Sequence, residues 1–156
     1  MNFLETLVKK NIINRYQVEE IIERSTKEQL SIEKILMEMG ISDEQILDAK
    51  SEYYGIEKKI IDYQEVDEDI VKMIPEDSAQ TYQMVAFNLE DGVLEVGMLD
   101  PRSIEAQNVL QFITVEKNLM YRAYILTEFG YEQLMKNYSG LSGEIGDALD
   151  SYIDIN

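Results

Sequence analysis

Apolar residues recur at helical spacing along the first third of the chain. Four segments each carry one apolar face, which predicts short helices over residues 2–10, 15–25, 31–40 and 43–55. Asn14 and Ser42 stand at the starts of the second and fourth segments, and each has a glutamine three residues later. This spacing is typical of a capping box, in which the two side chains satisfy each other's backbone amides.

The same segments form a twofold repeat. Residues Phe3 to Asn11 align with Ile32 to Gly40 at an offset of 29 positions. Residues Asn14 to Val18 align with Ser42 to Ile46 at an offset of 28, so the turn of the second copy is one residue shorter. We expect two similar helical hairpins that pack together as a helical subdomain over residues 1–55.

The pattern changes after Gly55, and the rest of the chain mixes strand and helix signals. Alternating apolar residues predict a hairpin and then a third strand, over 83–88, 93–98 and 119–125. Residues 58–63 are a further short strand candidate. Helical patterns lie between the strands, over 65–74, 75–82, 103–113 and 127–138. We therefore expect an α+β subdomain over residues 56–138, with a small, mainly antiparallel three-stranded sheet covered by helices over one face.

The last segment, residues 139–156, contains three glycines and four acidic residues but no basic one, which favours an acidic flexible linker. The acidic excess extends over the whole chain: the net charge of −17 divides into −4 for residues 1–55, −9 for 56–138 and −4 for 139–156. Such a balance argues against nucleic acid or an anionic membrane as a partner, because clustered Lys and Arg supply the affinity for both. No apolar run approaches the roughly 20 residues that span a bilayer.

The chain has no cysteine and no histidine. That excludes disulfides, thiolate metal ligands and the Ser-His-Asp or Cys-His catalytic arrangements, and it fits a cytosolic protein. The phosphate-binding pattern GxxxxGK[ST] is also missing from the sequence. We therefore expect no enzyme activity in this chain, no cofactor and no metal.

Three features stay open between a structural and a binding role. Tyr53 and Tyr54 could form a docking face with the helices of residues 3–22, or they could pack into a core. The acidic cluster over 65–69 could hold a divalent cation, although it lacks the calcium-loop pattern, or it could be the solvated start of a helix. Asp100 could contact a ligand at the mouth of a sheet, or it could open an Asp-Pro turn before the next helix.

Four short motifs follow one another along the chain. They are LMEMGISDEQI from Leu36 to Ile46, IPEDSAQTY from Ile74 to Tyr82, LEVGMLDP from Leu94 to Pro101 and EQLMKNY from Glu132 to Tyr138. In this order they resemble the N-terminal domain of the type IV pilus assembly and type II secretion ATPases (PilB and GspE types), from about residue 2 to 138. Each motif alone is common, whereas the ordered set is specific.

The resemblance implies a non-catalytic interaction or regulatory domain that docks its motor onto partner proteins. These partners would be the inner-membrane platform or the cytoplasmic adaptor proteins of a pilus or secretion machine. The location would be cytoplasmic, peripheral to the inner membrane through the partners. Residues 139–156 would lead toward an ATPase core in a hexameric parent protein, while the oligomeric state of the domain alone stays open.

An alternative function comes from family members called MshEN domains, which bind cyclic di-GMP through an R-L-G-x-x-L motif in each repeat. Here Asn-Phe-Leu at 2–4 and Ser-Ile-Glu at 31–33 stand where R-L-G would be. Both phosphate-binding arginines and both glycines that let the backbone approach a ligand are therefore missing. The degenerate ligand positions are Asn2, Phe3, Leu7, Val18, Ile22, Ile32, Leu36 and Asp100. A stand-alone α+β scaffold with an unrelated role is a third alternative.

Overall fold

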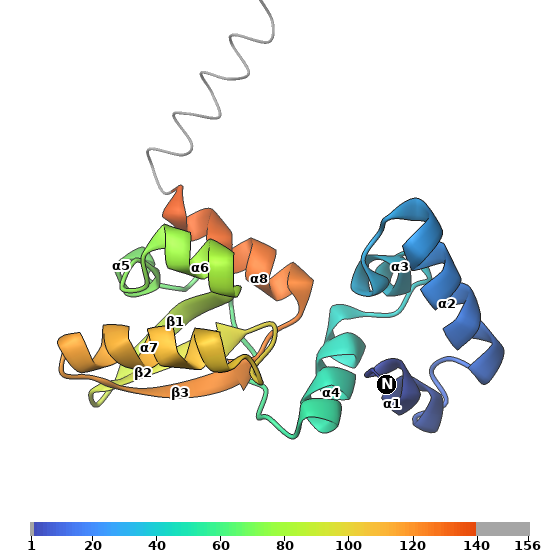
Figure 1. Cartoon of the computed structure of the whole chain (residues 1–156), viewed down its shortest axis with the longest axis horizontal. Helices are drawn as coiled ribbons and strands as arrows, with labels where there is room; N and C mark the ends of the chain where they lie inside the picture. Colours follow the sequence, from blue (N-terminus) through green and yellow to red (C-terminus); the bar gives the residue numbers. More distant parts are fainter. Residues whose placement is uncertain (1, 140–156) are drawn as a thin grey trace, which may run out of the picture.

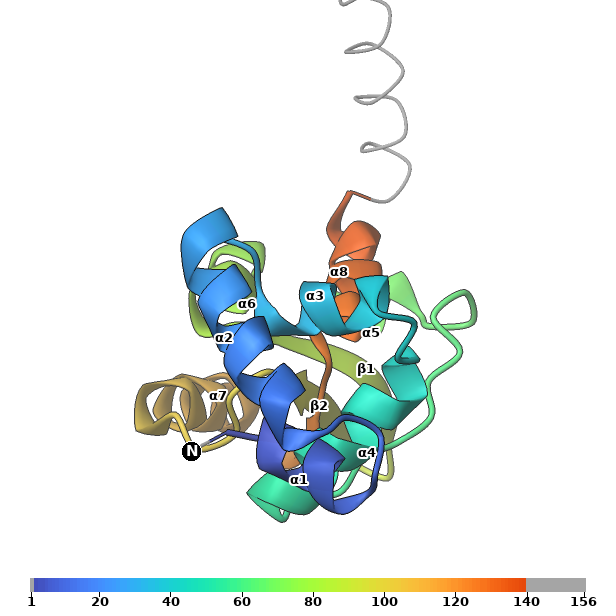
Figure 2. The same ribbon diagram turned by 90° about the vertical axis from the view of Figure 1, so that its right-hand side faces the viewer.

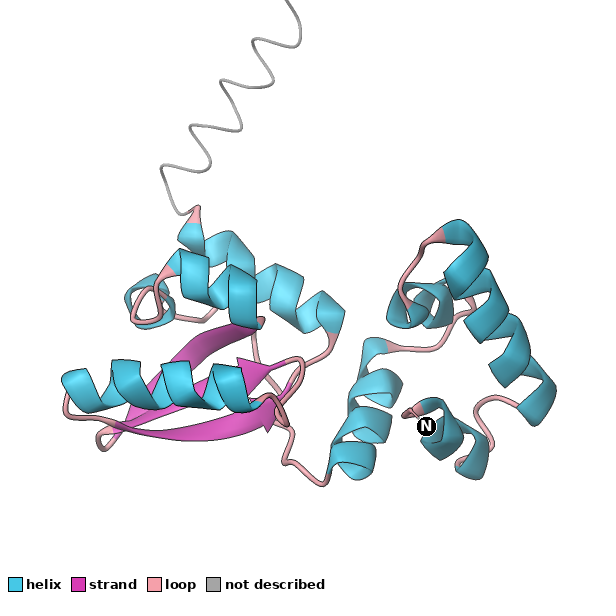
Figure 3. Cartoon of the chain, in the orientation of Figure 1, coloured by secondary structure: helices cyan, strands magenta, loops and turns pink. Residues whose placement is uncertain are grey.

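The computed structural model describes residues 2–139, which form two halves side by side (Figure 1). The first half consists of four helices: α1 Leu4–Lys9, α2 Arg15–Glu28, α3 Ile32–Glu38 and α4 Asp43–Tyr54. The second half contains, in order, α5 Glu68–Val71, α6 Glu76–Tyr82, β1 Met84–Glu90, β2 Val93–Met98, α7 Ile104–Glu116, β3 Met120–Ile125, α8 Glu128–Met135 and a 3₁₀ turn at Lys136–Tyr138 (Figure 3). The predicted α+β class is confirmed. Apart from Ser139, the predicted linker lies outside the described residues.

Both capping boxes that the sequence predicts are present. The Asn14 side chain accepts a hydrogen bond from Gln17 N at 2.9 Å, and Asn14 N donates to Gln17 Oε1 at 2.8 Å. Ser42 and Gln45 exchange the same two bonds at 3.1 and 3.0 Å. Gly55 ends α4 with a φ of 67°, a conformation that costs glycine little. Local side-chain chemistry therefore sets these helix boundaries.

The two repeats pack across each other around one apolar cluster. The first repeat forms α1 and α2, and the second forms α3 and α4. Helix α1 lies against α4 and helix α2 lies against α3, so each packed pair takes one helix from each repeat (Figure 2). The equivalent residues Leu7 and Leu36 are both fully buried in this cluster, as is Ile46. Burying a side chain of this size stabilises a fold by about 1.5–3 kcal/mol. The repeat spacing of the sequence thus encodes the core of the helical half.

The sheet has three strands in the order β1-β2-β3. β1 and β2 form the predicted antiparallel hairpin, with Met84 opposite Met98. β3 runs parallel to β2, with Val93 opposite Met120 and Met98 opposite Ile125. The sheet is therefore mixed, and the expectation of a mainly antiparallel sheet was wrong for its second strand pair. The reason is α7, which carries the chain back along the sheet before β3 begins, the crossover that a parallel pair requires.

Helices pack on both faces of the sheet, whereas the sequence led us to expect one covered face. α6 and α7 bury Ala79 and Leu110 against the face that carries Met84. α5 and α8 bury Val71 and Leu134 against the opposite face beside β1. Because consecutive strand residues point to opposite faces, β1 is buried on both sides over its first four residues, which are all apolar.

Residues 58–63, the additional strand candidate, form an irregular connection between the two halves and not a strand. The connection passes the end of β3, where Ile125 N donates to the Glu57 carbonyl at 3.0 Å. It then crosses the sheet face that carries Phe87, where Ile61 and Tyr63 pack against the apolar cluster. The packing of Ile61 and Tyr63 and the hydrogen bond from Lys59 Nζ to Glu95 hold this segment in place without a strand ladder.

Candidate functional site

A buried ion pair joins the helical half to the α/β half. Lys50 Nζ on α4 lies 3.1 Å from Glu33 Oε2 on α3 and donates to the Leu126 carbonyl at 2.6 Å. The second oxygen of Glu33 accepts from Glu128 N, in the first turn of α8, at 3.0 Å. Lys50 is 3% exposed and Glu33 is 8% exposed. These contacts tie two helices of the repeat to the connection between β3 and α8.

Burial dominates the electrostatics of the Glu33 carboxyl. Desolvation raises the pKa of Glu33, although the Lys50 charge and the hydrogen bond from Glu128 N both act in the opposite direction. A buried ion pair of this kind is costly to break, because one charge is then left in the interior without its partner. Its hydrogen bonds to the Leu126 carbonyl and from Glu128 N carry this buried network across the junction of the two halves.

A second junction contact is built on Arg102, which follows β2. Its guanidinium lies 5.1 Å from the ring centroid of Tyr53 and 4.8 Å from that of Tyr54. Its Nη2 also donates to the Tyr53 carbonyl at 3.4 Å. Both tyrosines are half-buried, and Tyr53 packs against the apolar cluster of the helical half. Of the two roles left open for this tyrosine pair, packing is the one these contacts favour.

The Asp-Pro turn holds Arg102 in this position. Asp100 Oδ1 accepts a hydrogen bond from Arg102 N at 3.1 Å, and the Asp100 carbonyl accepts from Ser103 N at 3.2 Å. Ser103 Oγ then caps α7 by accepting from Ala106 N at 3.2 Å. These are turn and capping interactions, the structural role considered for Asp100. Similarly, Asp67 in the acidic cluster caps α5 by accepting from Asp69 N at 2.9 Å.

The degenerate nucleotide-binding positions lie in different surroundings. Four of them are buried in the apolar cluster of the helical half: Phe3, Leu7, Val18 and Leu36. Ile32 is partly buried against that cluster, whereas Ile22 is 43% exposed. The Asn2 side chain accepts from Leu4 N at 2.9 Å, and Asp100 lies in the turn of the other half. The structure thus brings the four buried positions together as a core.

The sheet carries a polar network that was not predicted from the sequence. Glu95 on β2 is 8% exposed, and its carboxylate accepts from Lys59 Nζ at 2.5 Å, Asn88 Nδ2 at 2.8 Å and Tyr124 OH at 2.9 Å. A β-bulge at Phe87 places Asn88 opposite Glu95. Although burial raises the pKa of Glu95, the three hydrogen bonds together hold it below its ordinary value. A carboxylate in the middle of the apolar run VLEVGM was the signal for this network.

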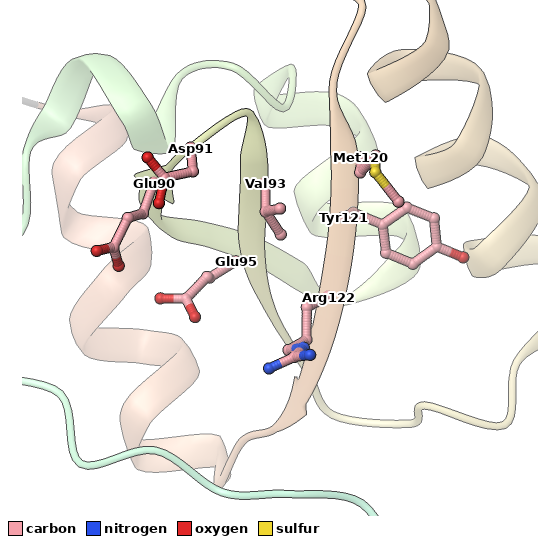
Figure 4. Close-up of a pocket in the computed structure, with 7 residues that line it drawn as sticks. All are labelled: Glu90, Asp91, Val93, Glu95, Met120, Tyr121 and Arg122. Carbon is pink, nitrogen blue, oxygen red and sulfur yellow. The ribbon is translucent and has the colours of Figure 1, made fainter.

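An open pocket of about 310 Å³ lies beside this network (Figure 4). It is lined by Glu90, Asp91, Val93, Glu95, Met120, Tyr121 and Arg122. Figure 4 shows the carboxylates of Glu90 and Glu95 on one side of the sheet, whereas the ring of Tyr121 points to the other side. Three carboxylates and one guanidinium make this pocket acidic on balance.

Three exposed apolar side chains lie on α7, and a fourth lies at the start of β3. Ile104, Phe112 and Val115 of α7 are 70%, 64% and 63% exposed, and Met120 is 72% exposed. Scattered exposed apolar side chains are ordinary, whereas a contiguous patch of them marks an interaction surface. Among the described helices, none is long and apolar enough to cross a membrane.

Comparison with known proteins identifies the family. The family model of the MshEN domain matches residues 61–142. The chain belongs to the MshEN family. A curated relative of this MshEN chain is the type IV pilus assembly ATPase PilB of Myxococcus xanthus (strain DK1622). It is 25% identical over 155 residues, which cover 94% of this chain and 27% of PilB, so the chain spans about a quarter of that relative.

Two solved structures share the fold of this MshEN chain. The structure of MshE with cdg has a TM-score of 0.63 at 20% identity and covers 89% of this chain and 97% of its own. The structure of the N-terminal domain of XpsE has a TM-score of 0.56 at 13% identity and covers 87% of this chain and 92% of its own. Both likenesses extend into the helical half, which the family model does not reach. The chain therefore shares the fold of both solved structures across its helical half and its α/β half.

Proposed function

We propose that this MshEN domain is a non-catalytic docking domain of a type IV pilus assembly ATPase, or of a type II secretion ATPase. It would hold the motor against the inner-membrane platform or a cytoplasmic adaptor of the machine. The observation that carries the proposal is the match of almost the whole chain to one quarter of PilB. The domain would work in the cytoplasm and reach the inner membrane only through its partners.

The chemistry of the chain supports a role in binding over one in catalysis. The sequence contains no histidine, no cysteine and no GxxxxGK[ST] loop, so ATP hydrolysis would belong to another part of the parent protein. The two most buried carboxylates, those of Glu33 and Glu95, both accept hydrogen bonds from other residues of the chain. What the described surface offers instead is exposed apolar side chains and an acidic balance.

The proposal can be tested by direct binding. The purified chain would be immobilised and exposed to the purified cytoplasmic parts of the platform and adaptor proteins of the same machine, with interferometry as the readout. We expect at least one of them to bind, and its affinity to fall with added salt because the domain is acidic. If none binds at micromolar concentration, docking is not the function of this domain.

A second candidate, cyclic di-GMP sensing, rests on the likeness to MshE with cdg. We take cdg to be this dinucleotide. The residues weigh against it, because Leu7 and Leu36 are fully buried and the Glu33 carboxylate already pairs with Lys50. Calorimetry with cyclic di-GMP decides: absence of heat at high micromolar ligand eliminates sensing, whereas saturable binding would establish it beside docking.

A further inference from the structure

The outer edge of β3 has no hydrogen-bonded neighbour over Met120 to Ala123 among the described residues, although α4 and Glu57 also contact this strand. In a parallel strand pair, the N–H and C=O of one residue point to the neighbouring strand and those of the next residue point away. Met120 N donates to the Gly92 carbonyl at 2.9 Å, and Leu126 N also reaches β2, so the even-numbered residues face β2. The odd-numbered residues face outward, and Ile125 N accordingly reaches the Glu57 carbonyl at 3.0 Å.

Tyr121 and Ala123 precede this contact and have no such partner. Their backbone groups point outward, and among the described residues no hydrogen bond reaches them from that side. The register of β3 with β2 is regular, and Met120 and Arg122 are exposed. β1, at the opposite edge, carries a bulge and has α5 and α8 beside it. An open, regular edge is a template for an added strand.

The acidic pocket lies directly beside this edge, because three residues of β3 line it. Glu90 and Asp91 form no ion pair with any described residue, whereas Glu95 is held by its three donors. The pocket therefore has two carboxylates available for a cation, and Val93 and Met120 offer apolar surface for the stem of a long basic side chain. Arg122 at the rim and Lys59, which pairs with Glu95, would repel a cation, but the three carboxylates outnumber these two positive charges.

We infer that the free edge of β3 takes an extended segment of a protein partner as a fourth strand, with a lysine or arginine of that segment in the pocket of Glu90, Asp91 and Glu95. The inference rests on the proposed docking function and names its surface and the chemistry of the partner. Alternate side chains of a strand point to opposite faces, so a basic residue on the pocket side has apolar neighbours toward α7. A second copy is a poor occupant, because it carries the same net charge of −17.

The probe is the capped peptide SGTVTVKVTGS, in which lysine and threonine share one face. Two matched peptides replace the lysine with glutamate (SGTVTVEVTGS) or the valines with proline (SGTPTPKPTGS). Amide NMR of the whole chain follows each titration. We expect rapid amide hydrogen exchange at Tyr121 and Ala123 in the free chain and slower exchange with the lysine peptide. The glutamate peptide should bind at least tenfold more weakly, and the proline peptide should leave both amides unchanged.

Two variants test the edge and the pocket separately. Ala123→Pro removes one outward N–H, a change that edge strands tolerate, and circular dichroism checks the fold. Glu90→Lys with Asp91→Asn leaves the strand intact, and asparagine suits the φ of 53° at residue 91. Ala123→Pro should abolish binding of the lysine peptide, and the Glu90→Lys, Asp91→Asn double variant should bind that peptide at least tenfold more weakly. Tyr16→Ser, at an 84% exposed side chain on α2, is the surface control and should bind normally.

Several outcomes overturn the inference. They are slow exchange at Tyr121 and Ala123 in the free chain, no binding of the lysine peptide at millimolar concentration, or unchanged binding by both variants. A concentration-dependent dimer that Ala123→Pro abolishes would show that a second copy occupies the edge. If the edge variants bind the platform or adaptor proteins as the original chain does, docking stands and this surface is wrong.

Discussion

Lys50→Met should destabilise the chain because it leaves a buried carboxylate without its cation. In the structure, Lys50 Nζ contacts Glu33 Oε2 at 3.1 Å and the Leu126 carbonyl at 2.6 Å. Methionine fills a similar volume but replaces neither contact. Glu33 would keep only the hydrogen bond from Glu128 N at 3.0 Å, and the Leu126 carbonyl would lose the lysine as a donor.

The magnitude follows from the burial of both side chains, which are 4% and 10% exposed, so solvent screens them little. Breaking a buried pair by removing one partner costs about 3–5 kcal/mol. The double variant Glu33→Gln with Lys50→Met should lose only about 1–3 kcal/mol, mainly for the unsatisfied Leu126 carbonyl, because glutamine can still accept from Glu128 N. A net stability of about 5–15 kcal/mol makes both losses measurable.

Urea unfolding followed by circular dichroism at pH 7 and pH 5 is the assay. Burial raises the pKa of Glu33 in the folded state, and the loss of Lys50 should raise it further. An acid with a raised folded pKa adds stability below its unfolded pKa, and this stability is lost as pH rises through the folded pKa. Lys50→Met should therefore recover part of its stability at pH 5. A loss under about 1 kcal/mol at pH 7, or a double variant no more stable than the single, would refute this reasoning.

Three further changes test other parts of the structure. Asp100→Ala removes the acceptor for Arg102 N and should lower stability by about 1 kcal/mol in thermal unfolding; unchanged melting would contradict the turn role. Glu95→Gln tests the lowered pKa of that carboxylate. The stability that the ionised carboxylate contributes is present above its unfolded pKa and is lost as pH falls through its folded pKa. The difference in unfolding free energy between the variant and the original chain should therefore shrink in urea unfolding between pH 6 and pH 3. Gly97→Ala puts a methyl group 2.4 Å from Leu126 Cγ. It should lower the free energy of unfolding in urea by about 1–3 kcal/mol. An unchanged free energy of unfolding would mean that the Leu126 side chain moves aside freely.

The helix boundaries were predictable because their signals are local. Asn14 with Gln17 and Ser42 with Gln45 specify capping boxes within four residues of chain. The repeat likewise predicted that Leu7 and Leu36 would occupy equivalent places, since matching apolar positions give matching helix faces. In each case the sequence neighbours are also the structural partners.

The remaining features depend on residues far apart in the chain. The orientation of β3 is set by the path of α7, which the strand pattern of residues 119–125 does not contain. Lys50 and Glu33 look like ordinary polar positions of two helices, and only the meeting of α3 and α4 with Leu126 buries them. The open edge of β3 is likewise a property of the assembled sheet.

The most direct test of the proposed function is deletion of residues 1–138 from the parent ATPase. The truncated and complete proteins would be compared for ATP hydrolysis in solution and for assembly of pili or export of secreted substrate in cells. If this domain docks the motor, hydrolysis by the core should stay within about twofold while assembly or export is lost. Assembly or export at the normal level without residues 1–138 would contradict the docking function.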